Sequence, residues 1–146
     1  MSDLRTEEDA DRERGIALAT EALHAAMRED WPAMAETVTA LSGSHALIWA
    51  VMAWCDTLIA RWPGGLEAAG APVLLGWLED GKGPVQSAQD VPAPARWAGQ
   101  VTAARAALDQ DAFFALLRAP AEGSDLGDCV QALVTSAALA VQEAVR

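Results

Sequence analysis

Residues 45–62 constrain the fold more than any other part of the chain, because a helix over this segment carries apolar side chains on almost every side. Three stripes at helical spacing cover it: Leu47, Val51, Trp54, Leu58 and Trp62; Ile48, Met52, Cys55 and Ile59; and Trp49, Ala53, Asp56 and Ala60. The uninterrupted apolar run from Ala46 to Cys55 is only half of the ~20 residues that a bilayer requires. We therefore expect the central helix of a bundle and no membrane span.

Start signals place two more helices before this one. Thr6 is followed by acidic residues that suit the positive end of a helix dipole, and it predicts a first helix over about 7–29. Within that region, residues 1–14 are expected to be frayed or solvated, because the apolar stripe begins only after them. Asp30 is expected to cap a second helix, and Ser44 to cap the central one.

Three helices are predicted in the second half of the chain. The first of them should extend over about 94–108. Asp109 or Asp111 is expected to cap a short helix that ends before the next proline. Ser124 or Asp125 is expected to cap the last helix, which is long and apolar on its inner face.

These patterns predict an all-α helical bundle of six main helices in a single domain, residues 1–146. Two three-helix halves, 15–62 and 94–146, are joined by a connection rich in glycine and proline, 63–93, in which 71–79 could form a short additional helix. A shift of 79 residues without gaps aligns the halves and pairs Asp30 with Asp109, Leu47 with Leu126, and Val51 with Val130. Duplication and the chance similarity of two amphipathic hairpins both account for this alignment.

The charge of the chain argues against binding to nucleic acid. The formal net charge is -11, and ten of the acidic residues fall within the first 36 positions. A protein that binds a phosphate backbone needs clustered lysine and arginine, and so does one that binds an anionic membrane. The polar, acidic amino terminus does not have the basic and then apolar pattern of a secretory signal, so we expect a cytoplasmic protein.

No constellation of residues indicates catalysis, a metal site or a cofactor. Glu21 and His24 have the spacing of a helical metal-ligand pair, but a dinuclear bundle site needs a second such pair and two further glutamates. Cys55 and Cys129 lie in apolar helical patterns and are expected to be buried free thiols. We therefore expect a protein that is not an enzyme and that holds neither a metal nor a cofactor.

The apolar helical surface favours a non-catalytic protein-interaction module, expected to self-associate. Its candidate interface is the stripe of small residues with one large anchor, namely Trp49, Ala53, Asp56 and Ala60, for which packing within the chain is the alternative. A second hypothesis is a binding site for a small apolar ligand between the halves, lined by Met52, Trp54, Trp97 and Phe113. A third is an acidic inhibitor or antitoxin that binds a basic partner.

Overall fold

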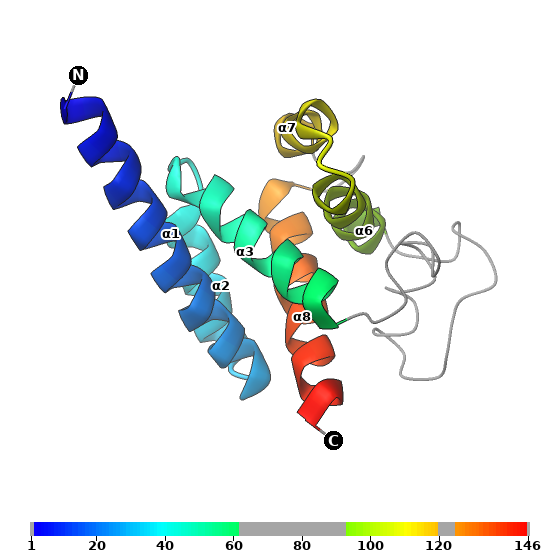
Figure 1. Cartoon of the computed structure of the whole chain (residues 1–146). Coiled ribbons are helices and arrows are strands. Elements are labelled where there is room, and N and C mark those ends of the chain that lie inside the picture. The colour runs from blue at the N-terminus through cyan, green and yellow to red at the C-terminus, as the bar shows by residue number, and fades with distance from the viewer. Residues whose placement is uncertain (1, 62–92, 120–124, 146) are drawn as a thin grey trace.

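A computed structural model describes residues 2–61, 93–119 and 125–145, and within these ranges the chain forms α-helices and no strand (Figure 1). The prediction of an all-α bundle of six main helices is confirmed. The predicted connection at 63–93, apart from Ala93, and its short helix at 71–79 lie outside the described residues. The helices are α1 (Ser2–Met27), α2 (Trp31–Leu41), α3 (Ala46–Arg61), α6 (Ala93–Ala106), α7 (Gln110–Arg118) and α8 (Leu126–Val145).

Short polar side chains cap four of these helices. The cap bonds are from Ala33 N to Asp30 Oδ1 (3.3 Å), from Ala46 N to Ser44 Oγ (3.0 Å), from Ala112 N to Asp109 Oδ1 (3.1 Å) and from Asp128 N to Asp125 Oδ1 (2.8 Å). Each satisfies an amide that has no partner within its helix. The caps predicted at Asp30 and Ser44 are confirmed. Where the sequence allowed two candidates, the cap is Asp109 for α7 and Asp125 for α8. The prediction that Thr6 marks the start of the first helix is wrong, because α1 begins at Ser2 and Thr6 lies inside it.

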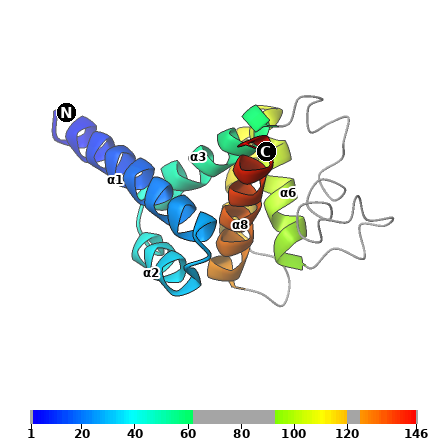
Figure 2. The same cartoon turned by 90° about the horizontal axis from the view of Figure 1, so that it is seen from below.

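Helices α3 and α8 pack against each other at the centre, with α1 and α6 on either side (Figure 2). Each flanking helix contacts both central helices. The largest fully buried side chains come from α3, α8, α6 and α2, whereas α1 contributes buried alanines; the large ones include Trp54, Trp97, Leu41, Leu58, Leu133 and Val130. The predicted central position of α3 is thus confirmed, and α8 shares it.

The α1–α2 and α6–α7 turns have the same backbone geometry. Glu29 and Leu108, 79 residues apart, both adopt the left-handed conformation, with φ of 59° and 58°. The next amide, that of Asp30 or Asp109, donates to the carbonyl oxygen five residues earlier at 2.9 and 3.0 Å. Both turns therefore end one helix with a left-handed residue and start the next with a capping aspartate.

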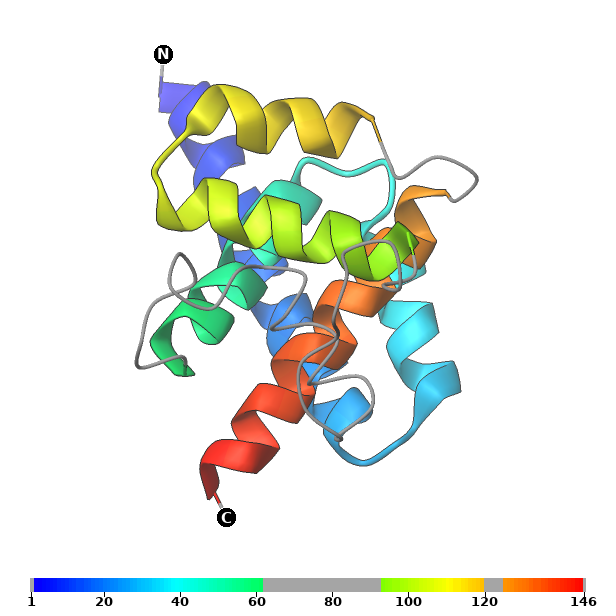
Figure 3. The same ribbon diagram turned by 90° about the vertical axis from the view of Figure 1, so that its right-hand side faces the viewer.

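The short helices α2 and α7 differ in how they pack. Helix α2 contacts both α1 and α8 and buries Met34, Thr37, Val38 and Leu41. Helix α7 packs chiefly on α6, beside which it lies as a hairpin (Figure 3), and buries Phe113. Phe114 stays half-buried and faces space above the amino end of α3.

Candidate binding groove

The predicted interface stripe of α3 lies between α1 and α6, and neighbouring helices partly cover it. Trp49 and Ala53 are half-buried, whereas Asp56 and Ala60 are exposed. Two of these side chains already have partners within the chain, Trp49 on α1 and Asp56 on α6.

Trp49 lies where α1 crosses α3 at close range. A side chain on Gly15 of α1 would overlap the carbonyl oxygen of Ala46, and its Cβ would lie 2.8 Å from Trp49 Cβ. The guanidinium carbon of Arg12 lies 5.9 Å from the centroid of the Trp49 ring, within the range of a cation–π contact. Glycine at position 15 thus allows a close helix crossing, and this crossing fixes Trp49 beside α1.

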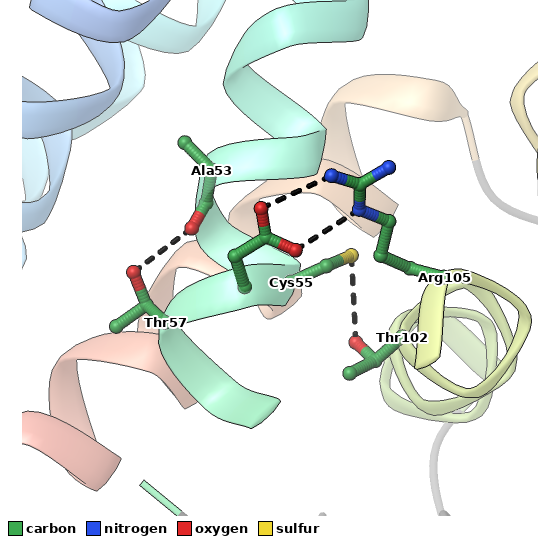
Figure 4. Close-up of polar contacts among 6 residues, drawn as sticks. Ala53, Cys55, Thr57, Thr102 and Arg105 are labelled. Carbon is green, nitrogen blue, oxygen red and sulfur yellow. Dashed lines mark hydrogen bonds and ion pairs between the residues drawn. The ribbon is translucent and has the colours of Figure 1, made fainter. Parts of the chain in front are cut away.

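Asp56 links α3 to α6 (Figure 4). Its carboxylate accepts hydrogen bonds from Arg105 Nε at 2.9 Å and Arg105 Nη2 at 3.2 Å, and this paired geometry raises the pKa of Arg105. Behind the ion pair, Cys55 Sγ lies 3.7 Å from Thr102 Oγ1. Burial raises the pKa of the Cys55 thiol to about 12, so this thiol is a neutral core group and no nucleophile at neutral pH.

The four residues predicted to line an apolar ligand cleft are divided between the core and a small pocket. Trp54 and Trp97 are buried, and their indole N–H groups donate to Ala19 O at 3.0 Å and Leu116 O at 2.8 Å. These bonds tie α3 to α1 and α6 to α7. Met52 and Phe113 line one pocket of about 40 Å³ next to the α6–α7 turn. That volume holds little more than a water molecule or two.

A larger hollow opens over the amino end of α3. It has a volume of about 650 Å³ and lies between the first turns of α1 and helix α7, which Figure 1 shows on opposite sides of α3. We call it the acidic groove, and its lining residues are Glu7, Glu8, Asp11, His45, Ile48, Trp49, Met52 and Phe114.

Two further hollows adjoin the acidic groove. One, of about 350 Å³, shares Glu7, Asp11 and His45 with it and adds Ala10 of α1 to the lining. The small pocket at the α6–α7 turn shares Met52 and Phe114 with it. Together they form a surface lined by four helices, α1, α3, α6 and α7, which suits a segment of polypeptide better than a compact small molecule.

The groove has an apolar floor and one acidic wall. Ile48, Met52 and Phe114 are half-buried, so they are available to a partner without leaving the fold. On the wall, Glu7 and Glu8 are exposed, and neither they nor Asp11 form an ion pair with any side chain that the structure describes. The local potential is therefore negative beside an apolar surface.

The amides at the amino end of α3 are already satisfied, although such a helix end often binds anions. Ala46 N donates to Ser44 Oγ, and Leu47 N and Ile48 N donate to the carbonyl oxygens of Ser44 and His45 at 3.2 and 3.3 Å. No free donor remains among these three amides for a phosphate or a carboxylate.

The described residues offer no group of three or more His, Cys, Asp or Glu side chains that could hold a metal ion. Glu21 and His24 are both exposed on α1. Cys55 and Cys129 are buried, as the sequence predicts. No helix in the part of the chain that the structure describes combines the length and apolar character needed to span a bilayer.

Sequence reasoning identified Trp49, Met52 and the excess of acidic residues, but it did not assemble the groove. It missed Ile48, His45 and Phe114 as groove residues. The consecutive aromatic residues Phe113 and Phe114 were the available signal, because neighbouring positions on a helix point in different directions and only one can face the core. Comparison with known proteins adds no relative: no family model, no curated protein and no solved structure matches the chain.

Proposed function

We propose that the protein is a non-catalytic interaction module that binds another protein in the acidic groove. The observation that carries the proposal is the hollow of about 650 Å³ with a half-buried floor of Ile48, Trp49, Met52 and Phe114. Large apolar and aromatic side chains that line a groove supply most of the energy in protein interfaces. A cytoplasmic location is part of the same proposal.

We also propose that the two halves of the bundle are pseudo-repeats, each a three-helix unit that closes its core on the other. The left-handed residues Glu29 and Leu108 and the capping residues Asp30 and Asp109 support this, because both pairs are separated by 79 positions. The first described residue of α6, Ala93, corresponds to Arg14 of α1, and the turns of α1 before Arg14 lie outside the part of the alignment that the structure describes in both halves. Those turns form the acidic wall of the groove.

Site-specific photo-crosslinking in cells of the native host tests the binding function. A photoreactive phenylalanine analogue replaces Met52 in the groove or, as a control, Thr20 on the exposed face of α1. We expect a discrete protein adduct from position 52 that position 20 does not give and that Ile48→Glu abolishes. The same adducts from both positions, or none from position 52, would contradict the proposal. An adduct of twice the chain mass would identify self-association instead.

A further inference from the structure

Resting on the proposed function, we infer that the partner places a basic amphipathic helix in the acidic groove. Its apolar face lies on Ile48, Met52 and Phe114, and its lysine or arginine side chains reach Glu7, Glu8 and Asp11. Three features carry the inference: the charge of the wall, the helical character of every surface that lines the groove, and the charge of the chain itself.

The wall is open to cationic side chains of a partner, because no arginine among the described side chains forms an ion pair with Glu7, Glu8 or Asp11. Arg12 lies over the Trp49 ring, and Arg14 Nη2 lies 3.5 Å from Ala40 O of α2. A partner that buried Glu7, Glu8 and Asp11 without compensating charge would leave carboxylates desolvated, which is unfavourable. An acidic or neutral partner is therefore disfavoured at this wall.

The surroundings favour a helix over an extended segment. An extended peptide gains affinity by donating and accepting main-chain hydrogen bonds at the edge of a sheet. The groove is lined by side chains of α1, α3 and α7 and by His45, and the described residues contain no strand. A helix satisfies its own backbone and carries apolar and basic side chains on adjacent faces at spacings of three and four residues. Met52 adds a flexible floor that adapts to the shape of the partner.

A second copy of the chain does not fit this groove as well. Each copy has a formal net charge of -11, so a homodimer closed through the acidic groove would bring two strongly negative bodies together. A basic partner gains from the same field, both in affinity and in the rate of association.

Fluorescence anisotropy with three labelled peptides of about 18 residues, or five helical turns, tests the inference. The first contains leucine and lysine arranged on opposite faces of a helix. The second has glutamate in place of lysine, and the third has the composition of the first in an order that mixes the two faces. We expect the full chain to bind the first peptide most tightly, and to bind it more weakly as salt rises, because the screening length shortens.

Two charge-matched triple variants locate the contact. Glu7→Gln, Glu8→Gln and Asp11→Asn together should weaken binding of the first peptide about tenfold or more, since each exposed pair contributes modestly and three act together. Glu21→Gln, Glu36→Gln and Asp128→Asn remove the same charge from exposed positions outside the groove and should change binding less than about twofold. Met52→Glu should abolish binding, and circular dichroism checks that each variant is folded.

Each other outcome overturns the inference in a defined way. Equal binding of the mixed-face peptide would show attraction by charge alone, without an apolar floor. Another outcome is that the glutamate peptide binds as tightly as the first peptide and loses its binding in the Met52→Glu variant. That result would show that the groove binds protein but would overturn the inference that its partner is basic. Failure to bind the first peptide also overturns the inference, and the crosslinking at Met52 then decides separately whether the proposed function survives. A dimer that Met52→Glu dissociates would make a second copy the occupant.

Discussion

Met34, Val38 and Leu41 of α2 are buried against the rest of the bundle, whereas α7, the other short helix, buries Phe113 and leaves Phe114 half-buried. Both helices follow turns of the same geometry and begin at a capping aspartate. The difference therefore does not arise in the turns. It arises from where each helix packs, since α2 contacts α8 in addition to its hairpin partner and α7 packs chiefly on α6.

This difference leaves part of the surface of α3 without a cover. Ile48 and Met52 of α3 remain half-buried under the acidic groove, and the first turns of α1 flank it with Glu7 and Glu8. Helix α2 thus completes the core that it packs on, whereas part of the α3 surface beneath α7 stays uncovered. Packing that a chain does not complete by itself is a frequent origin of binding sites.

The largest loss of stability is expected from truncating the buried tryptophans, one in each half of the chain, that share the core. Trp54→Ala and Trp97→Ala should each lower the free energy of unfolding by about 3–5 kcal/mol, because both rings are buried and each donates a hydrogen bond to another helix. Trp31→Ala is the control, since Trp31 is 45% exposed and should cost less than about 1 kcal/mol. Urea unfolding followed by circular dichroism measures all three. Equal losses at Trp31 and Trp54 would contradict this core.

A smaller loss of stability is expected when a glycine is replaced in α1, and almost none when a glycine is replaced in α8. Gly15→Ala should destabilise the fold by about 1–3 kcal/mol, because the new Cβ would overlap Ala46 O and crowd Trp49. Gly127→Ala in α8 should change stability by less than about 1 kcal/mol, because among the described residues its Cβ would contact the Asp125 carboxylate alone, at 3.2 Å, and alanine favours the helix. The same unfolding measurement compares them, and a stabilising Gly15→Ala would show that α1 and α3 do not cross closely.

Replacing either capping aspartate should lower the stability by a similar amount, but the two replacements should speed hydrogen exchange in different parts of the bundle. Asp30→Ala and Asp109→Ala should each cost about 1 kcal/mol, because each removes the acceptor for one amide. We expect Asp109→Ala to speed hydrogen exchange in α7 alone, and Asp30→Ala to speed it throughout the bundle, because α2 is packed into the core. Identical exchange patterns in the two variants would remove the distinction between α2 and α7.

The smallest effect is expected at the ion pair between α3 and α6. Asp56→Asn should cost about 0.2–1 kcal/mol, because the Asp56 and Arg105 side chains are 54% and 32% exposed and water screens their attraction. The cost should fall as salt is added. Unfolding at low and high salt measures it, and a loss above about 2 kcal/mol would mean that this contact is part of the core.

The sequence predicted most of the helices because their signals are local. Asp30, Ser44 and Asp109 cap the helices that follow them, and the stripes of α3 correctly indicated its central position. The acidic groove could not be predicted in the same way, because it depends on the distance between helices that are far apart in sequence. The periodicity of α7 shows which face is apolar, but not whether that face meets α3 or only α6.

The partners of Trp49 illustrate the same limit. Its stripe of small residues leaves room either for another helix of the chain or for another subunit, and the structure places α1 beside it through Gly15. A glycine within a helical pattern can mark a close helix crossing, but the sequence does not say which helix approaches. The acidic residues of α1 were visible as a charge excess, and only the fold puts Glu7, Glu8 and Asp11 beside an apolar floor.

Methionine oxidation by hydrogen peroxide, followed by mass spectrometry, tests the central claim most directly. Met34 of α2 is buried and Met52 of α3 lies half-buried in the acidic groove, so the two residues report on a covered and an uncovered surface of one molecule. The account predicts fast oxidation of Met52 and slow oxidation of Met34 in the free chain, with Met52 protected once the leucine–lysine peptide is bound. Equal oxidation rates in the free chain, or a bound peptide that leaves the Met52 rate unchanged, would contradict it.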